Sequence, residues 1–395
     1  MGTEFKSRAN LEIERYSQEL NKVGEEIWSN PELGFEEYKA HEILTDFLEQ
    51  KGFHVDRSYL GISTAFRATF ENQAKTSNIC VVCEYDALPE IGHACGHNLI
   101  AEAGIAAGLG IKAALEGNGA PKGRITVMGT PAEEGLGGKV KLIEKGAFDD
   151  VDVAMMAHPC PTNILEPVCP AIVQVEVTFN GKAAHAAAFP WEGINALDAA
   201  ILAYNNVSVL RQQLKPTIRI HGIITNGGAK PNIIPEQSAM EYCIRATKRK
   251  EVLELMPKVI ACFEAAAKAT GCTVDVKEPH PSYDDMVHNK VVSRLYKTNS
   301  EKLGMTFVES PEPKGSTDMG NVSHMIPAIQ PGYHIGDGTQ VNHTRDFTTV
   351  ANMPMAYLNT LTVAKAMAMT AIDLFVNPEL LQQAKKFFNE KAQFL

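Results

Sequence analysis

The sequence lacks several features that would point to membranes or nucleic acid. No unbroken apolar run reaches the roughly 18 residues that a membrane-spanning helix needs. Residues 1–10 are polar, and 11–21 have an ordinary charged helix pattern, so the start does not resemble a secretory signal. Basic clusters are scarce: the net charge is −10, and we expect Lys248-Arg249-Lys250 to lie on a solvated turn. These absences predict a cytoplasmic protein without a membrane or nucleic-acid partner.

Cysteine is present but suggests no disulfide framework. Eight cysteines are scattered over 395 residues, which favours reduced thiols. Hydrophobic residues make up 45% of the chain and charged residues 21%, a mixture typical of globular proteins with packed interiors. Because the chain is too long for one ordinary core, we expect two domains.

The first part of the chain has the pattern of an α/β domain. Helical periodicity covers 11–28 and 36–51. Strands and helices then alternate, which predicts a mixed sheet flanked by helices on both faces. The expected elements are a strand at 79–83, a helix at 99–116, a strand at 124–128, a helix at 139–145 and a strand at 151–156.

A different pattern begins near Pro170. Residues 172–179 alternate between apolar and polar side chains, as a half-exposed antiparallel strand does. The order strand, helix, strand, strand, helix, strand is typical of a ferredoxin-like module. We therefore predict a small α+β domain inserted into the larger one, with segments 1–170, 171–284 and 285–395. The remaining elements of the insertion are expected at 193–211, 217–224, 238–246, 251–270 and 273–277.

The segment with the clearest chemistry follows the expected strand at 79–83. Three potential metal ligands lie within five residues here: His93, Cys95 and His97. Imidazole and thiolate together favour zinc and its neighbours over calcium or magnesium. By spacing alone, all three side chains are candidate ligands.

Two later strands also end in polar motifs. Glu133-Glu134 follows the second strand of the predicted sheet, and His158 follows the third. Because ligands gather at the carboxyl ends of strands in such sheets, one cleft can collect Glu134 and His158 with Cys95 and His97. Taken singly, paired glutamates favour a solvated loop, and a lone histidine or cysteine favours a buried structural residue. On three successive strand ends, a metal site is the better interpretation.

Several motifs along the chain, taken together, match one family in order and spacing. They are Glu84-Tyr85-Asp86-Ala87-Leu88-Pro89, His93-Ala94-Cys95-Gly96-His97, Pro131-Ala132-Glu133-Glu134, Ala157-His158-Pro159, Gly181-Lys182-Ala183-Ala184-His185-Ala186, Asn232-Ile233-Ile234-Pro235 and Asn342-His343-Thr344. They resemble the dinuclear metallo-amidohydrolases, which include hippurate hydrolase, the plant auxin-conjugate hydrolases and the p-aminobenzoyl-glutamate hydrolase subunits. Aminoacylase and the zinc carboxypeptidases are more distant relatives. The motif GSTDMGNVS at 315–323 looks closest to the p-aminobenzoyl-glutamate and β-alanyl-dipeptide branch.

This resemblance implies a zinc-peptidase-like catalytic domain with two divalent metal ions, zinc or manganese. Cys95 would bridge the ions, Glu133 would be the general base, and Asp86 would orient a ligating imidazole. The resemblance gives His93 no metal role. Many relatives have aspartate where this chain has Asn98, which removes a charge beside the expected ions. The implied metal ligands are Cys95, His97, Glu134, His158 and His343.

The resemblance also implies that the inserted domain is a lid and dimerisation domain, so we expect a homodimer or tetramer. The histidine that matches His185 reaches across a dimer interface in relatives and stabilises the oxyanion of the tetrahedral intermediate. Asn232 resembles a residue that contacts substrate. Arg245 has two open interpretations, a ligand for a substrate carboxylate and a surface strand residue.

The leading functional hypothesis is a metal-dependent amidohydrolase or peptidase. Its expected substrates are small N-acyl amino acids, dipeptides or p-aminobenzoyl-glutamate-like amides, attacked by a metal-bridging water with Glu133 as base. One alternative is a non-catalytic scaffold or regulator that retains the fold. Another is a hydrolase that uses the Cys95 thiol as its nucleophile, which would need neither the glutamate pair nor a third strand-end histidine.

Overall fold

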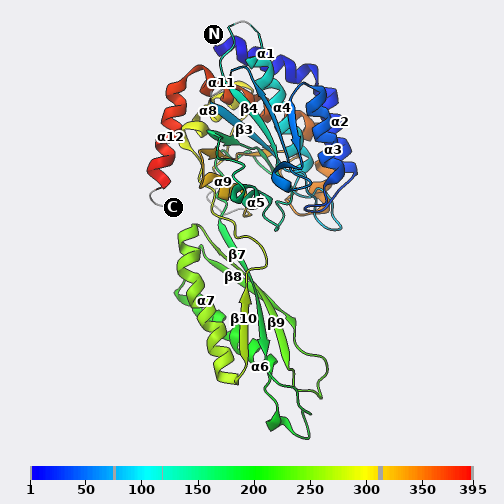
Figure 1. The fold of residues 1–395 in the computed structure, drawn as a ribbon, viewed down its shortest axis with the longest axis vertical. Helices are drawn as coiled ribbons and strands as arrows, with labels where there is room; N and C mark the ends of the chain where they lie inside the picture. The colour runs from blue at the N-terminus through cyan, green and yellow to red at the C-terminus, as the bar shows by residue number, and fades with distance from the viewer. Residues whose placement is uncertain (1, 74–76, 118, 310–314, 393–395) are drawn as a thin grey trace. The chain divides into compact units, whose positions relative to one another are not determined.

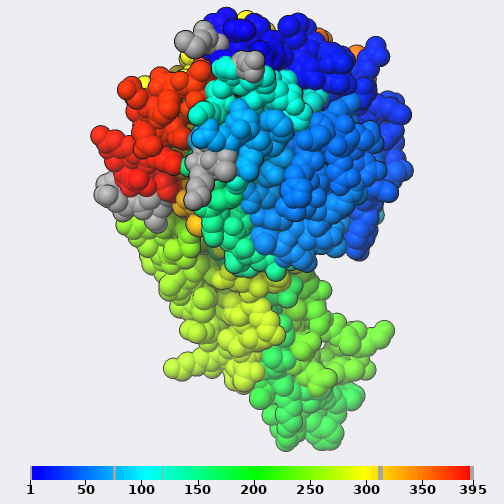
Figure 2. Space-filling view, turned by 45° about the horizontal axis from the view of Figure 1, so that its top comes forward, coloured from blue at the N-terminus to red at the C-terminus, as the bar shows by residue number. Residues whose placement is uncertain are grey.

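The computed structural model describes residues 2–73, 77–117, 119–309 and 315–392, which divide into two compact units. The first unit is made of Met1–Val168, Met286–Pro313 and Thr317–Leu395. The second is made of Cys169–Asp285 with Lys314–Ser316. Both ends of the chain therefore belong to the first unit, and Figure 2 shows the N-terminal and C-terminal segments, blue and red, on its surface.

The first unit is built on a six-stranded mixed sheet, as the sequence predicts. β3, β4, β5 and β11 pair in parallel, and β1 and β2 extend the sheet in antiparallel pairing from β4 (Figure 1). Neither β1 nor β2 was expected from the sequence. In sheet order the strands are β1 (His54–Arg57), β2 (Phe66–Glu71), β4 (Arg124–Gly129), β3 (Asn78–Cys83), β5 (Val153–Met155) and β11 (Ala328–Ile329). A separate parallel pair consists of β6 (His158–Cys160) and β12 (Gly332–His334).

Helices contributed by both ends of the chain belong to this unit. The single helix expected at 11–28 is wrong, because the chain leaves helical geometry at Tyr16 (ψ 10°) and forms two helices. The helices of the unit are α1 (Gly2–Arg15), α2 (Ser17–Ser29), α3 (Tyr38–Gln50), α4 (His97–Leu115), α5 (Gly138–Glu144), α8 (Lys290–Lys302), α9 (Met319–Ser323), α10 (Arg345–Val350), α11 (Pro354–Val376) and α12 (Pro378–Ala392).

Helix α4 is the centre of the core. It contacts β3 and β4 on one side, and α1, α2 and α11 also pack against it. A Cβ at Gly104 would lie 2.3 Å from Cys83 Sγ, and one at Gly108 would lie 2.4 Å from Val127, so glycine permits this close approach to the sheet. By length and composition α4 could cross a membrane, although Glu102 and Lys112 interrupt its apolar residues. Its apolar window is 94% buried inside the protein, so these side chains are used for internal packing.

The second unit has the predicted ferredoxin-like order of elements. Its four strands form an antiparallel sheet in the order β10-β7-β9-β8, and both helices pack against β7 and β9. Alternate side chains of β7, from Val173 to Phe179, are buried in this core, which explains the alternating pattern in the sequence. The elements are β7 (Ala171–Asn180), α6 (Ala196–Leu210), β8 (Arg219–Asn226), β9 (Gln237–Ala246), α7 (Arg249–Thr270) and β10 (Thr273–Lys277).

Candidate metal centre

The predicted metal ligands lie in the first unit, on segments that leave the strands. Gly96 (φ 77°) precedes α4, and a Cβ there would lie 2.8 Å from Pro159 Cγ, so glycine lets the start of α4 approach the segment beside His158. The site residues come from four places: Asp86, Cys95 and His97 after β3, Glu133 and Glu134 after β4, His158 at the start of β6, and His343 before α10.

Two groups of donor atoms meet at Cys95. One group joins Cys95 to His97 and His158, and the other joins it to Glu134 and His343; within each group the ligand atoms lie within 4.8 Å of one another. Cys95 Sγ is 3.6 Å from His158 Nε2, and His343 Nε2 is 3.4 Å from Glu134 Oε1. The structure therefore brings all five predicted ligands together, with the sulfur atom common to both groups.

Unpaired buried atoms test whether this site suits metal ions. His97 Nε2 is buried without a hydrogen-bond partner and lies 3.9 Å from Glu134 Oε1, a buried acceptor that has only the long 3.4 Å contact with His343 Nε2. A buried polar atom without a partner costs about 1–3 kcal/mol, so native proteins rarely leave such an atom beside a poorly paired acceptor. Nitrogen, sulfur and carboxylate donors in this arrangement fit divalent ions such as zinc.

Both inner histidine rings are oriented by their second nitrogen. His97 Nδ1 is 2.9 Å from Asp86 Oδ1, and His158 Nδ1 is 2.8 Å from the carbonyl oxygen of Pro159. Each contact leaves Nε2 directed at the donor groups, as metal-binding imidazoles require. Asp86 Oδ2 also accepts a hydrogen bond from the Glu134 backbone amide at 2.9 Å, so one carboxylate fixes two candidate ligands. Burial alone would raise the pKa of the Asp86 carboxyl group, but the attraction and hydrogen bond of His97 are stronger and lower that pKa.

Glu133 lies beside these donors in an environment suited to a base. Its carboxylate belongs to a group with His97 and Glu134, and the side chain is 6% exposed. Burial, followed by repulsion from Glu84, Glu134 and Asp318, raises the pKa of Glu133 well above its ordinary value. A carboxylate with a raised pKa takes a proton more readily, which suits general base catalysis.

A buried ionic cluster beside Glu133 was not recognised from the sequence. Lys139 Nζ contacts a carboxylate oxygen of Glu84 and lies 2.6 Å from Asp318 Oδ1, and all three side chains have no exposure. Burial opposes the charge of Lys139, but Asp318 and Glu84 outweigh it and raise the pKa of the ammonium group. Glu84 and Asp318 belong to motifs named in the sequence analysis, but neither residue was given a role there, and Lys139 was predicted only as the first residue of a helix.

The family described as Peptidase family M20/M25/M40 matches residues 80–363. This match covers well over half of the chain, and it includes each of the candidate metal ligands. The chain belongs to peptidase family M20/M25/M40. Membership confirms the predicted family resemblance and the prediction of a hydrolase that acts on peptide or related C–N bonds.

Known proteins similar to this M20 chain include dipeptidases and amidohydrolases. The chain is 48% identical to the Xaa-Arg dipeptidase of Mus musculus, with 98% of this chain and 93% of that protein covered. It is 29% identical to a p-aminobenzoyl-glutamate hydrolase subunit of Escherichia coli, with 95% and 92% covered. A solved structure of a Bacillus subtilis dinuclear metal-binding peptidase from the M20 family covers 89% of this chain and 98% of its own at a TM-score of 0.65 and 19% identity, which shows the shared fold.

Two residues near the ligands have structural contacts in this M20 chain. Among the described residues, His93 belongs to none of the groups of side chains that could hold a metal ion. Its Nε2 is 3.2 Å from the carbonyl oxygen of Ile27. The Asn98 amide donates to the carbonyl oxygens of Ala351 at 3.1 Å and Gly24 at 3.4 Å. An aspartate at this position would set a carboxylate against these acceptors, which gives a packing reason for asparagine.

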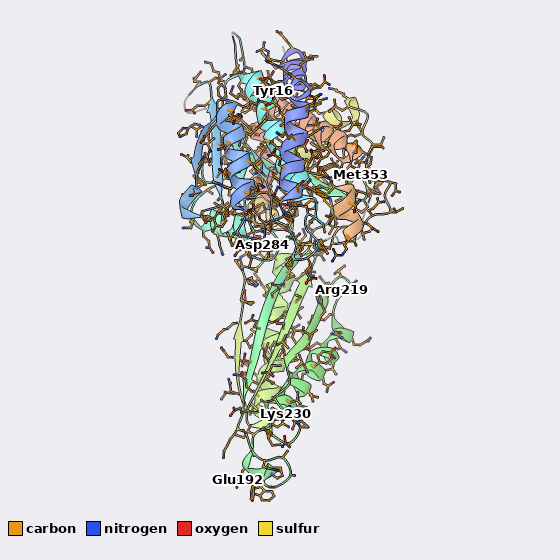
Figure 3. The ribbon with its side chains drawn as sticks, turned by 90° about the vertical axis from the view of Figure 1, so that its right-hand side faces the viewer. Tyr16, Glu192, Arg219, Lys230, Asp284 and Met353 are labelled. Atoms are coloured by element: carbon orange, nitrogen blue, oxygen red, sulfur yellow. The ribbon has the colours of Figure 1, made fainter. Side chains whose placement is uncertain are left out.

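The predicted site residues of the second unit do not form one cluster within the chain. An isolated antiparallel β-bridge joins the backbones of His185 and Ile233, and the amide of Ala186 donates to the Asn232 carbonyl oxygen at 3.0 Å. The segments that contain His185 and Asn232 are therefore neighbours. Arg245 is opposite Arg219 in the sheet register. In Figure 3, Arg219 lies toward one end of the second unit, whereas Lys230, close to Asn232 in sequence, lies toward the other end.

His185 and Arg245 also differ in their surroundings. His185 is exposed, and its Nδ1 accepts from the backbone amides of Ala187 at 3.3 Å and Ala188 at 3.1 Å, so Nε2 is the nitrogen left for another partner. Arg245 is half-buried and donates to Ser316 Oγ at 3.0 Å. No acidic side chain of the described residues forms an ion pair with it, which suits a residue that binds an external carboxylate.

Proposed function

We propose that the protein is a dinuclear-metal dipeptidase that prefers a basic C-terminal residue in its substrate. The observation that carries the proposal is the pair of donor groups that share the Cys95 sulfur atom. The substrate preference is supported by the name of the 48% identical relative, an Xaa-Arg dipeptidase. Cleavage of p-aminobenzoyl-glutamate is the second candidate, supported by the 29% identical relative. N-acyl amino acids are further substrates to be tested.

The five predicted ligands would hold the two ions, and the Cys95 sulfur atom is the donor common to both groups. When bound, the ions polarise the amide carbonyl and lower the pKa of a bound water. The thiolate favours zinc over manganese at this site. Asp86 would keep the His97 imidazole in its ligating orientation through the 2.9 Å contact with Nδ1.

Glu133 would perform the proton transfers. Its carboxylate lies with the ligand atoms of His97 and Glu134 in one group, so it is within reach of a water held at the ligands. It would take a proton from this water at a carboxylate oxygen and deliver it to the leaving amine nitrogen. The Cys95 thiol is a poor alternative nucleophile, because a thiol mechanism would need neither Glu134 nor the several histidines whose donor atoms surround the sulfur atom.

The second unit would complete the site through self-association. His185 would donate from Nε2 to the oxyanion in the partner subunit, Asn232 would contact the substrate, and Arg245 would bind its carboxylate. Several large apolar side chains are exposed on this unit, which supports an interface because association with a partner subunit would remove them from water. They lie on α6 and β8 and include Ile201, Leu202, Tyr204, Val209 and Ile223.

Metal analysis combined with a hydrolysis panel tests the proposal. The panel contains dipeptides ending in arginine, lysine or leucine, N-acetyl and N-benzoyl amino acids, and p-aminobenzoyl-glutamate. We expect two ions per chain, highest kcat/KM for the basic dipeptides, and loss of activity after chelation that added zinc or manganese reverses. Fully metallated protein with no amide hydrolysis would support the scaffold alternative and reject the proposal. Chelator-resistant activity that C95S abolishes would support the thiol alternative.

We also propose that the protein is located in the cytoplasm. None of the eight cysteines forms a disulfide, which supports a reducing compartment such as the cytoplasm. Fractionation of cells that produce the protein would test it, and recovery in a membrane or secreted fraction would contradict it.

A further inference from the structure

A fourth group of donor atoms, made of carboxylates alone, lies next to the groups described above. Glu84, Glu133 and Asp318 each offer an oxygen atom within 4.8 Å of the others, and all three side chains are buried. Buried carboxylates in such a group need a cation, because isolated charges are strongly disfavoured inside a protein. The chain supplies that cation itself: Lys139 Nζ contacts Glu84 and lies 2.6 Å from Asp318 Oδ1.

Lys139 holds Asp318 at two points. Besides the Nζ contact, the Lys139 backbone amide donates to Asp318 Oδ2 at 2.8 Å. Asp318 immediately precedes α9, and Lys139 lies in the first turn of α5. These two contacts therefore link the two helices. Glu133 is on the loop between β4 and α5, so the start of α5 determines where that loop ends.

Glu84 connects the same cation to the candidate ligands. One of its oxygens contacts Lys139, while Oε2 is buried without a hydrogen-bond partner, 3.6 Å from His97 Nε2. Lys139 therefore contacts two of the three carboxylates in the group, and the third is Glu133. Without the ammonium group, Glu84 and Asp318 would repel each other and Glu133.

We propose that the ammonium group of Lys139 is a built-in cation that positions Glu133 for proton transfer. Lys139 is a positioning residue, because it touches Glu84 and Asp318 rather than the reacting atoms. The proposal rests on the role of Glu133 as base in the proposed function. It also implies that this carboxylate group binds no divalent ion while Lys139 is present.

The first test compares K139M with K6M. Methionine keeps an unbranched side chain and removes the charge. Lys6 is a matched control, since it also pairs with an aspartate at 2.6 Å (Asp373) but contacts none of the candidate ligands. With a basic dipeptide as substrate, we expect K139M to lose about 100-fold in kcat with KM within about threefold, because a positioned general base typically contributes this much. K6M should keep the wild-type kcat, and both variants should retain two ions per chain.

The second test replaces the missing cation from solution. In K139A, n-propylammonium supplies the atoms that alanine lacks, and we expect it to raise kcat at least about tenfold, while n-propanol does not. Metal analysis of K139A at saturating manganese should show one more ion per chain than the wild type, a readout independent of activity. If K139M is unstable, E84Q/K139M removes one unpaired charge and should fold with the same loss of kcat.

Two results would overturn the proposal. One is a K139M protein whose kcat stays within about threefold of K6M, with the ion count of K139A unchanged. The other is a K139M protein that loses ions in parallel with activity, which would make Lys139 a support for the metal ligands. A wild-type protein that binds no metal ions would instead reject the proposed function. In that case, an ion bound by K139A but not by the wild type would still show that Lys139 serves as the cation of the carboxylate group.

Discussion

The two units carry their predicted site residues in opposite ways. In the first unit, His97 and Glu133 are buried, and His97 is oriented by a carboxylate contact. In the second unit, His185 and Asn232 are exposed on neighbouring segments, and Arg245 lies on the strand β9. A metal centre needs donors that are preorganised inside one core, whereas the residues for which we propose contact with substrate or a partner subunit are exposed or half-buried in the single chain.

The largest expected effect comes from E133Q in the first unit. Glutamine has nearly the same shape but cannot accept the water proton, so we expect kcat to fall about 1000-fold while both ions stay bound. Steady-state kinetics with metal analysis checks this. E116Q, which alters the exposed Lys112–Glu116 pair, is the control and should behave like the wild type. An active E133Q would remove Glu133 from the role of base.

His185→Ala tests the second unit at its exposed residue. Loss of an oxyanion donor typically costs about 100- to 1000-fold in kcat, and because His185 is exposed the thermal unfolding should stay unchanged. Mixing inactive H185A and E133Q proteins should restore part of the activity if the site is shared between subunits. No recovery in dimers shown to have exchanged subunits would argue that each site is made within one chain.

Arg245→Ala should affect binding more than turnover. A lost charge-assisted contact typically costs about 1.5–3 kcal/mol, so KM for dipeptides with a free carboxylate should rise about 10- to 100-fold. The same peptides with an amidated C-terminus should respond equally in wild type and variant. R219A, the neighbour in the sheet register, is the control. Equal effects on both kinds of peptide would assign Arg245 a structural role only.

The smallest effect is expected from N98D, which leaves the donor groups in place. The new carboxylate would face the carbonyl oxygens of Ala351 and Gly24, and an unmatched buried polar contact costs about 1–3 kcal/mol of unfolding free energy. Urea unfolding measures the loss, and N232D on the exposed loop of the second unit should show none. A stable N98D with altered metal preference would instead place this position next to the ions.

Local sequence patterns predicted most of the elements that carry the site. The strand at 79–83, the helix at 99–116 and the elements of the ferredoxin-like module were visible because their side chains alternate or repeat within short windows. The strands β1 and β2 were missed. Most side chains of β1 are exposed and none is a buried apolar residue, so the strand leaves no alternating pattern. The strand β2 pairs with β4, which is distant in the sequence, and a local pattern cannot reveal such pairing.

In the sequence alone, local patterns and the family resemblance pointed to the residues of the candidate metal centre. Cys95, His97, Glu134 and His158 could be assigned to one cleft, because strand ends in an α/β sheet converge, and the family resemblance added Glu133 and His343. Only the tertiary structure placed Lys139 between Glu84 and Asp318, the latter 179 positions away in the chain. A contact over that separation leaves no local pattern, and its stability depends on burial of all three charges together. The tertiary structure likewise decided that Asn98 binds backbone carbonyl groups, because their positions depend on how α2 and the segment after α10 pack around α4.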